Sequence, residues 1–186
     1  MERITESTTI EELAAIVSTT LEEAGISAVL SGGAVVSIYT HNEYESSDLD
    51  FICPAAASSI AEAIAPLGFK REGRMFSHPR TALFVEFPPG PLAVGDELIR
   101  ATDVGEKRTA AGTIRLLTPT QCVMDRLAAY FHWNDLQSLD QAVMVASSQE
   151  ISLRKLEAWA KREGASDKLR RFKQELATRK RHPRRR

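Results

Sequence analysis

The sequence predicts a protein of the α/β (α+β) class, in which a small mixed sheet with flanking helices is followed by a helical lobe. Apolar segments of strand length alternate with helical patterns as far as residue 117, whereas only helical periodicity follows. The chain has 186 residues, of which 43% are hydrophobic and 26% charged, so it can bury a core without disulfides. We expect an α/β core over residues 1–117, a helical lobe over 118–178 and a basic, disordered tail over 179–186.

The first predicted helix begins at a capping box. Thr9 stands where an N-cap belongs, and Glu12 follows three residues later, so the two can satisfy each other's backbone N–H groups. Apolar residues then recur at helical spacing as far as Leu21. Gly25 supplies the residue that most easily adopts the left-handed conformation at a helix end.

The rest of the α/β part alternates between strands and helices. Its strands are short and apolar, and its breaks fall at glycine, proline or polar residues. The expected elements are a strand over 27–31, a helix over 34–39 after a glycine pair, a polar loop over 41–47, a strand over 48–53, an Ala-rich helix over 55–67, a small hairpin within 69–78, a strand over 82–87 and, after a Gly/Pro-rich connection, a strand over 113–117.

A second helix-start signature opens the lobe. Thr118 is an N-cap, Pro119 occupies the first helical position and Gln121 follows three residues after the cap. This helix is expected to run to about Trp133. Three further helices are expected over 136–146, 153–162 and 167–178, the last two separated by Gly164.

Charge is distributed unevenly along the chain. The net charge is -1, but the last eight residues carry six Lys or Arg, so the remaining residues carry about -7. Such a tail can attract the phosphates of RNA or DNA, although a chance run of charges explains it nearly as well.

Neither targeting nor a disulfide framework is indicated. The N-terminal residues are acidic and polar, unlike a signal peptide, and no apolar run reaches the roughly 20 residues that span a bilayer, so a cytoplasmic location is expected. The two cysteines, Cys53 and Cys122, lie in apolar surroundings without metal-ligand spacing and are expected to be buried thiols.

A glycine turn follows the first strand. Ser31, Gly32 and Gly33 stand between a strand and a helix, where glycines allow a ligand to approach the backbone and the helix start offers unpaired N–H groups. This arrangement suits a phosphate. A tight strand-to-helix turn without any ligand explains the glycines equally simply.

Acidic residues interrupt the next strands. Asp48 and Asp50 share one face of a strand because strand side chains alternate, and a hard divalent cation would relieve the repulsion between them. Glu86 stands alone within the apolar segment 82–87, where burial without a partner would be costly. The alternative interpretation places all three acids on solvated strand faces.

Together these features resemble the nucleotidyltransferase superfamily typified by DNA polymerase beta. That family has a hydrophobic-Gly-[Gly/Ser] turn, then Asp-x-[Asp/Glu] flanked by hydrophobic residues, then a third acid on a later strand. Residues 30–33, 48–51 and 85–87 match these elements in order. Within the superfamily, they are most similar to the AbiEii-type toxin nucleotidyltransferases. The resemblance covers residues 25–90 and extends more loosely to the helices at 118–146.

The resemblance implies a nucleotidyltransferase of corresponding fold. It would transfer a nucleotidyl group from a nucleoside triphosphate to a hydroxyl of an RNA such as tRNA, of a protein or of a small molecule. Asp48, Asp50 and Glu86 would be the catalytic residues and the ligands of two Mg²⁺ ions. A toxin of a toxin–antitoxin system, with an antitoxin partner, is the more specific implication.

The triphosphate site is implied in the same way. Ser31, Gly32 and Gly33 would hold the phosphates, and the family's acidic–basic pair on a later helix corresponds to Asp125–Arg126, which makes Arg126 a nucleotide contact. A surface salt bridge is its alternative role. The second family stretch, Arg-Asp, corresponds to 134–135, where Asn134 replaces the basic residue.

Four other residues have two interpretations each. Lys107 and Arg108 lie in an expected polar loop and could contact a triphosphate or only solvent. His41 could contact a nucleotide, although a surface histidine is the simpler interpretation. Trp133 could stack on a base, but packing between helices is the more common role of a tryptophan in a helical lobe.

Two further function classes remain open. The fold could be kept without catalysis, as a module that binds a nucleotide or a partner protein. In the third class the acids are merely surface residues, and Leu153, Leu156 and Trp159 form a face for a dimer or a partner. Intramolecular packing explains that face equally well.

Overall fold

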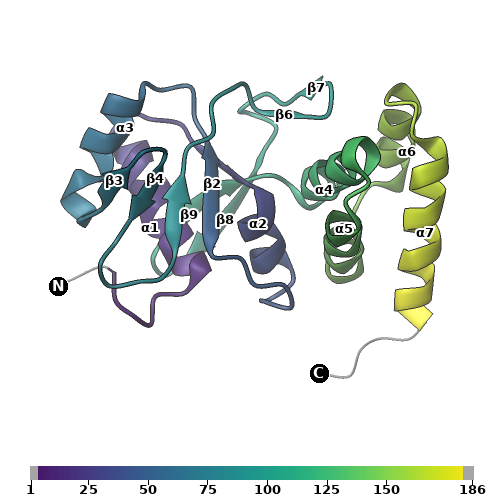
Figure 1. Ribbon diagram of the computed structural model, residues 1–186, viewed down its shortest axis with the longest axis horizontal. Coiled ribbons are helices and arrows are strands. Elements are labelled where there is room, and N and C mark those ends of the chain that lie inside the picture. Colours follow the sequence, from purple (N-terminus) through teal and green to yellow (C-terminus); the bar gives the residue numbers. More distant parts are fainter. Residues whose placement is uncertain (1–3, 182–186) are drawn as a thin grey trace.

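The computed structural model describes residues 4–181, and its centre is a seven-stranded mixed sheet. The strands lie in the order β3-β4-β5-β2-β1-β9-β8, and a two-stranded hairpin, β6-β7, stands apart from them (Figure 1). The strands are β1 (Val29–Ser31), β2 (Asp48–Ile52), β3 (Lys70–Glu72), β4 (Met75–Ser77), β5 (Phe84–Glu86), β6 (Ala93–Val94), β7 (Glu97–Leu98), β8 (Gly105–Thr109) and β9 (Gly112–Leu116).

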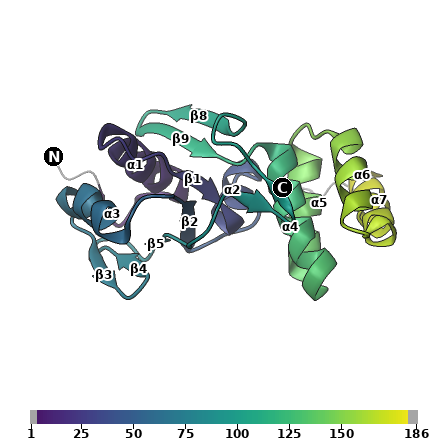
Figure 2. The same cartoon turned by 90° about the horizontal axis from the view of Figure 1, so that it is seen from above.

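The helices divide between the sheet and the lobe. α1 packs against β9, β1 and α3, while α2 packs against β2 and also against α4 and α5, so that one hydrophobic core continues from the sheet into the lobe (Figure 2). The helices are α1 (Ile10–Glu23), α2 (Gly32–Tyr39), α3 (Ala57–Ile64) with the 3₁₀ turn η1 (Ala65–Leu67), α4 (Pro119–Trp133), α5 (Leu136–Ser148), α6 (Leu153–Arg162) and α7 (Ser166–Arg181).

The expected α/β class and both capping boxes are confirmed. The Thr9 hydroxyl accepts a hydrogen bond from Glu12 N, and Glu12 accepts one from Thr9 N at 2.9 Å. Thr118 and Gln121 make the same reciprocal pair at the start of α4. Whether the α/β part and the lobe are separate folding domains stays a prediction.

Three strands were missed by the sequence patterns. β6 and β7 lie in the segment expected to be an irregular connection, and β8 contains the residues expected in a polar loop. β8 is an edge strand in which Glu106, Lys107 and Arg108 are charged, so it lacks the apolar alternation that marks a strand. Its pairing comes instead from the tight turn to β9.

The lobe buries the residues that might have formed a partner face. Leu156 and Trp159 are fully buried, and the Trp159 ring stacks on Phe131 with 5.1 Å between centroids. Only Leu153 remains exposed, because it lies at the first turn of α6. The interpretation of these three residues as an interaction face is therefore wrong.

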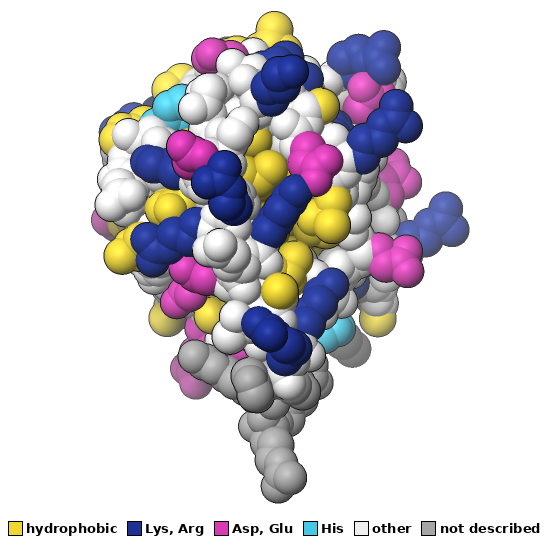
Figure 3. Space-filling model, turned by 90° about the vertical axis from the view of Figure 1, so that its right-hand side faces the viewer, with side chains coloured by type: hydrophobic (Ala, Val, Ile, Leu, Met, Phe, Trp, Pro, Cys, Tyr) yellow, Lys and Arg dark blue, Asp and Glu magenta, His cyan; other side chains and the backbone are white. Residues whose placement is uncertain are grey.

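The C-terminal helix is longer than the sequence indicated. α7 continues through Arg181, so the first three residues of the expected disordered tail are helical; residues 182–186 lie outside the described part of the chain. Burial of Leu176 and an ion pair between Arg179 and Glu43 hold the last turns. Lys and Arg side chains gather on the outer face of the lobe (Figure 3).

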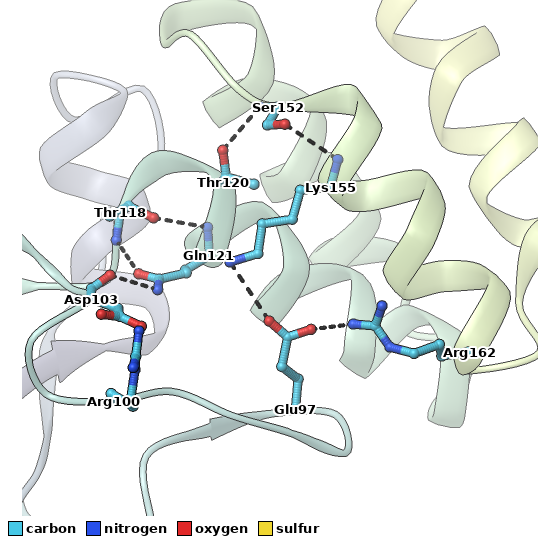
Figure 4. A network of polar contacts seen from close by, with 9 residues as sticks. All are labelled: Glu97, Arg100, Asp103, Thr118, Thr120, Gln121, Ser152, Lys155 and Arg162. Carbon is cyan, nitrogen blue, oxygen red and sulfur yellow. Dashed lines mark hydrogen bonds and ion pairs between the residues drawn. The ribbon is translucent and has the colours of Figure 1, made fainter.

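Polar contacts tie the β6-β7 connection to the lobe (Figure 4). Glu97 forms ion pairs with Lys155, at 3.6 Å, and with Arg162, both on α6. Gln121 Nε2, at the start of α4, donates to the Asp103 carbonyl at 2.9 Å. The segment between β5 and β8 is therefore held to α6 through Glu97 and to the first turn of α4 through Asp103. Among the described residues, no helix has the length and apolar character required to span a membrane.

The turn from β8 to β9 depends on Gly112. Its φ of +143° belongs to a region that essentially only glycine adopts, and a Cβ there would meet Thr19 Oγ1 and lie 3.0 Å from the Ala15 carbonyl oxygen. We expect Gly112→Ala to lower the free energy of unfolding by about 2–3 kcal/mol. The control Gly73→Ala also has positive φ, +66°, but open space around it, and should lose only about 1 kcal/mol.

Urea unfolding followed by circular dichroism measures both variants. Equal losses of unfolding free energy in the two variants would show that the close contacts of residue 112 with Thr19 and Ala15 on α1 contribute nothing.

Candidate functional site

The three acids predicted from the sequence lie on one face of two adjacent strands. β2 and β5 pair in parallel with Asp50 opposite Glu86 and Leu49 opposite Val85. Leu49 and Val85 are fully buried, so the acids, which alternate with them, point to the other side of the sheet. Asp48 stands two residues before Asp50 on that same side. Adjacent strands are about 4.8 Å apart, which makes Asp50 and Glu86 neighbours.

The glycine turn lies against this acidic group. β1 pairs antiparallel to β2 with Ser31 opposite Asp50. Gly32 follows with φ +70°, and a Cβ at this position would lie only 2.6 Å from Asp50 Oδ2. The turn therefore needs glycine for its conformation and for the close approach of the carboxylate to the backbone.

The loop from His41 to Ser47 folds back over the start of α2. A Cβ on Gly33 would lie 2.8 Å from Ser46 Oγ and 3.3 Å from the Tyr44 ring, so this position also needs glycine. Ser46 Oγ donates to Asp48 Oδ1 at 2.5 Å and thereby orients that carboxylate. No sequence motif marks Tyr44 or Ser46, and both were missed.

The start of α2 has no side-chain cap. Ser31 is the N-cap, but its hydroxyl donates to the Asp50 carbonyl oxygen at 3.3 Å instead of accepting from the helix. The first turn contains no acid either. Its N–H groups and the positive end of the helix dipole are therefore available to an anion beside the acids.

An acidic–basic pair on α4 reaches the same region. Arg126 donates from Nε and Nη2 to Asp125 Oδ2, at 3.0 and 2.6 Å, and Nη1 lies 3.4 Å from Gln141 Oε1. The two side chains are only 19% and 22% exposed, so this is not the surface salt bridge that the sequence allowed. Their helix packs against α2, which begins at the glycine turn, and the charge of Arg126 partly opposes the rise in the pKa of Asp50.

The negative charge of the three acids is only partly balanced by positive side chains nearby. Burial, followed by the charges of Asp48 and Glu86, raises the pKa of Asp50 to about 6, and Arg126 only partly opposes this. At neutral pH the three carboxylates would share a region in which further positive charge is favourable.

The donor set fits Mg²⁺, which prefers carboxylate oxygens. As the side chains stand, no group of three His, Cys, Asp or Glu within residues 4–181 converges closely enough to hold an ion together. Asp48 is turned towards Ser46, as expected for carboxylates that repel one another.

Several other candidates lie elsewhere. Lys107 is on β8 and pairs with Glu11 at 2.8 Å, and Arg108 is exposed on the same edge strand, so neither is in the expected loop. His41, with φ +53°, lines a cavity of about 410 Å³ between the start of α1, the end of α2 and the β8-β9 turn, and none of the three site acids lines it.

At the end of α4, Trp133 and the pair Asn134–Asp135 have other roles than the sequence suggested. Asn134 adopts φ +55° as the C-cap of α4, and Asp135 caps α5 by accepting from Gln137 N at 2.9 Å, so this pair has a structural role. Trp133 is 77% exposed and does not pack between helices as expected. Cys53 and Cys122 are free and buried, as the sequence indicated.

Comparison with known proteins supports the fold. Neither a scan of protein families nor a search of curated proteins finds a match. A nucleotidyltransferase-like antigenic protein from Paracoccidioides brasiliensis superposes with a TM-score of 0.52 at 11% identity, covering 75% of this chain and 77% of that one. The antibiotic-resistance factor ANT(2'')-Ia superposes with a TM-score of 0.52 at 12% identity, covering 96% and 100%. The chain therefore has a nucleotidyltransferase-like fold.

Proposed function

We propose that this protein is a magnesium-dependent nucleotidyltransferase, on the premise of its nucleotidyltransferase-like fold. The observation that carries the proposal is the parallel register that sets Glu86 beside Asp50, with Gly32 against the same carboxylate. Three acids from two strands thus adjoin an uncapped helix start. This combination supplies an oxygen donor set for a cation and an N–H donor set for a phosphate in one place.

Each group has a role that its position supports. Asp48, Asp50 and Glu86 would hold two Mg²⁺ ions, which when bound supply charge stabilisation for the attacking and leaving oxygens. Glu86 would also accept the proton of the acceptor hydroxyl.

The remaining groups would bind the triphosphate. Gly32, Gly33 and the first turn of α2 would donate backbone hydrogen bonds to its oxygens, and Ser31 would shape the turn through its bond to β2. Arg126, oriented by Asp125, would neutralise charge on the phosphates.

The acceptor and the biological role are finer proposals. An RNA, a protein and a small molecule each carry the hydroxyl that such a site needs. The toxin role, with an antitoxin partner and tRNA as acceptor, rests on the sequence likeness to AbiEii-type proteins alone. The antibiotic-resistance role belongs to ANT(2'')-Ia, and a small-molecule acceptor is included in the test for that reason.

A nucleotide-binding module without catalysis is the second candidate. Two observations favour it. Asp48 accepts a hydrogen bond from Ser46, and no three His, Cys, Asp or Glu side chains among the described residues are close enough together to hold a metal ion. Such a module would bind triphosphate through α2 and Arg126 without transferring it.

Transfer of label distinguishes the two candidates. The protein is incubated with α-³²P-labelled triphosphates, Mg²⁺ and a pool of RNA, proteins and aminoglycosides. The enzyme hypothesis predicts labelled product with the wild type and with Asp140→Ala, an exposed acid on α5, but not with Asp48→Ala or Glu86→Ala. Triphosphate binding by calorimetry without label transfer to any acceptor class supports the module instead.

The guanidinium of Arg126 gives a graded test. Lys retains the charge but loses the planar pair of donors that contacts Asp125. We expect Arg126→Lys to raise the KM for the triphosphate about tenfold with a smaller effect on kcat. The control Arg108→Lys, exposed on β8, should behave as the wild type. Identical kinetics in both variants would remove Arg126 from the triphosphate site.

A further inference from the structure

The chain separates its charges between its two ends. Residues 1–150 contain 10 Lys or Arg and 21 Asp or Glu, a net charge of -11. Helices α6 and α7 together contain 11 Lys or Arg and three Asp or Glu, a net charge of +8. Lys and Arg side chains are prominent at this end of the molecule, interspersed with acidic, hydrophobic and other side chains (Figure 3), and we call the surface formed by α6 and α7 the basic face.

Part of the basic face is not neutralised by the protein itself. Arg170 and Arg171 have acidic partners on α7, and Lys173 has one on α6. Arg154, Lys161 and Lys180 are exposed, and within the described residues they have no acidic group within 4.0 Å. Lys155 and Arg162 share the single carboxylate of Glu97, and Arg179 pairs with Glu43. The surface therefore retains charge that favours a polyanion.

The basic face adjoins the proposed catalytic site. Arg179, near the end of α7, pairs with Glu43 in the loop that follows α2. Three residues later in the same loop, Ser46 holds the Asp48 carboxylate at 2.5 Å. A chain of phosphates that follows α7 would thus arrive at the loop that borders the three acids.

An exposed aromatic side chain lies at the edge of the basic face. Trp133 ends α4 and is 77% exposed, the most exposed large hydrophobic side chain in residues 4–181. Lys168 Nζ donates to the Tyr130 and Phe131 carbonyl oxygens, at 3.1 and 2.7 Å, so the first turn of α7 lies at this helix end. Unpaired bases stack on such aromatic groups, whereas bases within a duplex do not.

We propose that the basic face binds a folded RNA whose single-stranded end runs along α7, from Trp133 beside the first turn of this helix to the loop that borders the acidic site. This inference rests on the proposed function, because it names the acceptor class of that site. Phosphates match the unneutralised cations, and unpaired bases match Trp133. A membrane surface fits poorly, since the apolar residues of α7 point inwards: Leu169, Phe172 and Leu176 are buried.

RNA binding can be measured without nucleotide or catalysis. The probe is a fluorescein-labelled RNA stem–loop with a single-stranded 3′ end, titrated with the full chain and followed by anisotropy at several salt concentrations. The test variant is Lys161→Glu/Lys180→Glu. The matched control, Lys70→Glu/Arg74→Glu, makes the same charge change on the exposed β3-β4 hairpin at the opposite end of the molecule (Figure 2).

The test variant should bind the probe about tenfold to a hundredfold more weakly at 0.1 M salt, with a salt dependence smaller by about two phosphate contacts. The control should stay within about threefold of the wild type, because the altered hairpin is remote from the probe. Trp133→Ala should weaken binding of the probe but not of a blunt RNA duplex.

Three results would overturn the inference: equal loss in both double variants, equally tight binding of poly-glutamate or of phosphatidylserine vesicles, or no binding of the RNA. The two proposals fail separately. Label transfer to a protein or small molecule without RNA binding would support the nucleotidyltransferase proposal and refute the RNA-binding face. RNA binding that persists in Asp48→Ala, with no transfer by the wild type, would leave only the RNA-binding surface.

Discussion

Replacement of Asp50 by Asn should abolish nucleotidyl transfer and at the same time stabilise the protein at neutral pH. The loss of activity is expected to be at least about a thousandfold, or about 4 kcal/mol in the barrier, because the residue lies between Asp48 and Glu86 and would share in holding the cations. The gain in stability follows from the same position, since the carboxylate is partly buried among like charges.

The sign of the stability effect follows from the pKa. The pKa of Asp50 is raised from 3.8 to about 6, mainly by burial and then by Asp48 and Glu86. The folded protein therefore binds this proton more tightly than the unfolded chain does, and stability falls as pH rises from about 4 to about 6. Because the side chain is partly solvated, we expect roughly 1–3 kcal/mol to be lost over this interval.

Urea unfolding at pH 4.5 and at pH 7.5 tests this prediction. Asp50→Asn should be more stable than the wild type at pH 7.5, by about 1–3 kcal/mol, and should differ less at pH 4.5. Added Mg²⁺ should stabilise the wild type at pH 7.5 but have a much smaller effect on Asp50→Asn. Asp140→Asn, which removes an exposed carboxylate from α5, serves as the control. A destabilised Asp50→Asn variant that retained transfer would contradict both parts.

Gly32→Ala should lose at least about a hundredfold in activity for a modest loss of stability. The new Cβ would stand 2.6 Å from Asp50 Oδ2, so the carboxylate must turn away, and displacements of about 1 Å at a reacting centre are expected to cost about a hundredfold. The positive φ of +70° adds a backbone penalty of about 1–2 kcal/mol to folding.

Gly25→Ala separates these two effects. Gly25 has nearly the same φ, +73°, but a Cβ there would meet nothing within 4 Å. Both variants should lose about 1–2 kcal/mol of stability, while only Gly32→Ala should lose activity and the stabilisation by Mg²⁺. Equal activity in the two would show that the approach of the turn to Asp50 has no functional consequence.

Structural features with local causes could be predicted well from the sequence. The capping pairs Thr9–Glu12 and Thr118–Gln121 involve residues three apart, and both helices begin where the pairs indicate. β8 could not be predicted, because the charges of an edge strand give no periodic apolar signal and its pairing depends on β9. Trp133 was assigned to packing because tryptophan is usually buried, and only its place at a helix end exposes it.

For the candidate site, the sequence by itself determined that Asp48 and Asp50 share a face and that glycines follow β1, because strand alternation and the conformational freedom of glycine are local properties. Only the tertiary structure decided that Glu86 lies beside Asp50, that α4 with Arg126 packs against α2 and that Ser46 orients Asp48. These contacts join distant segments, and their register is set by packing of the buried residues between the acids rather than by any spacing along the chain.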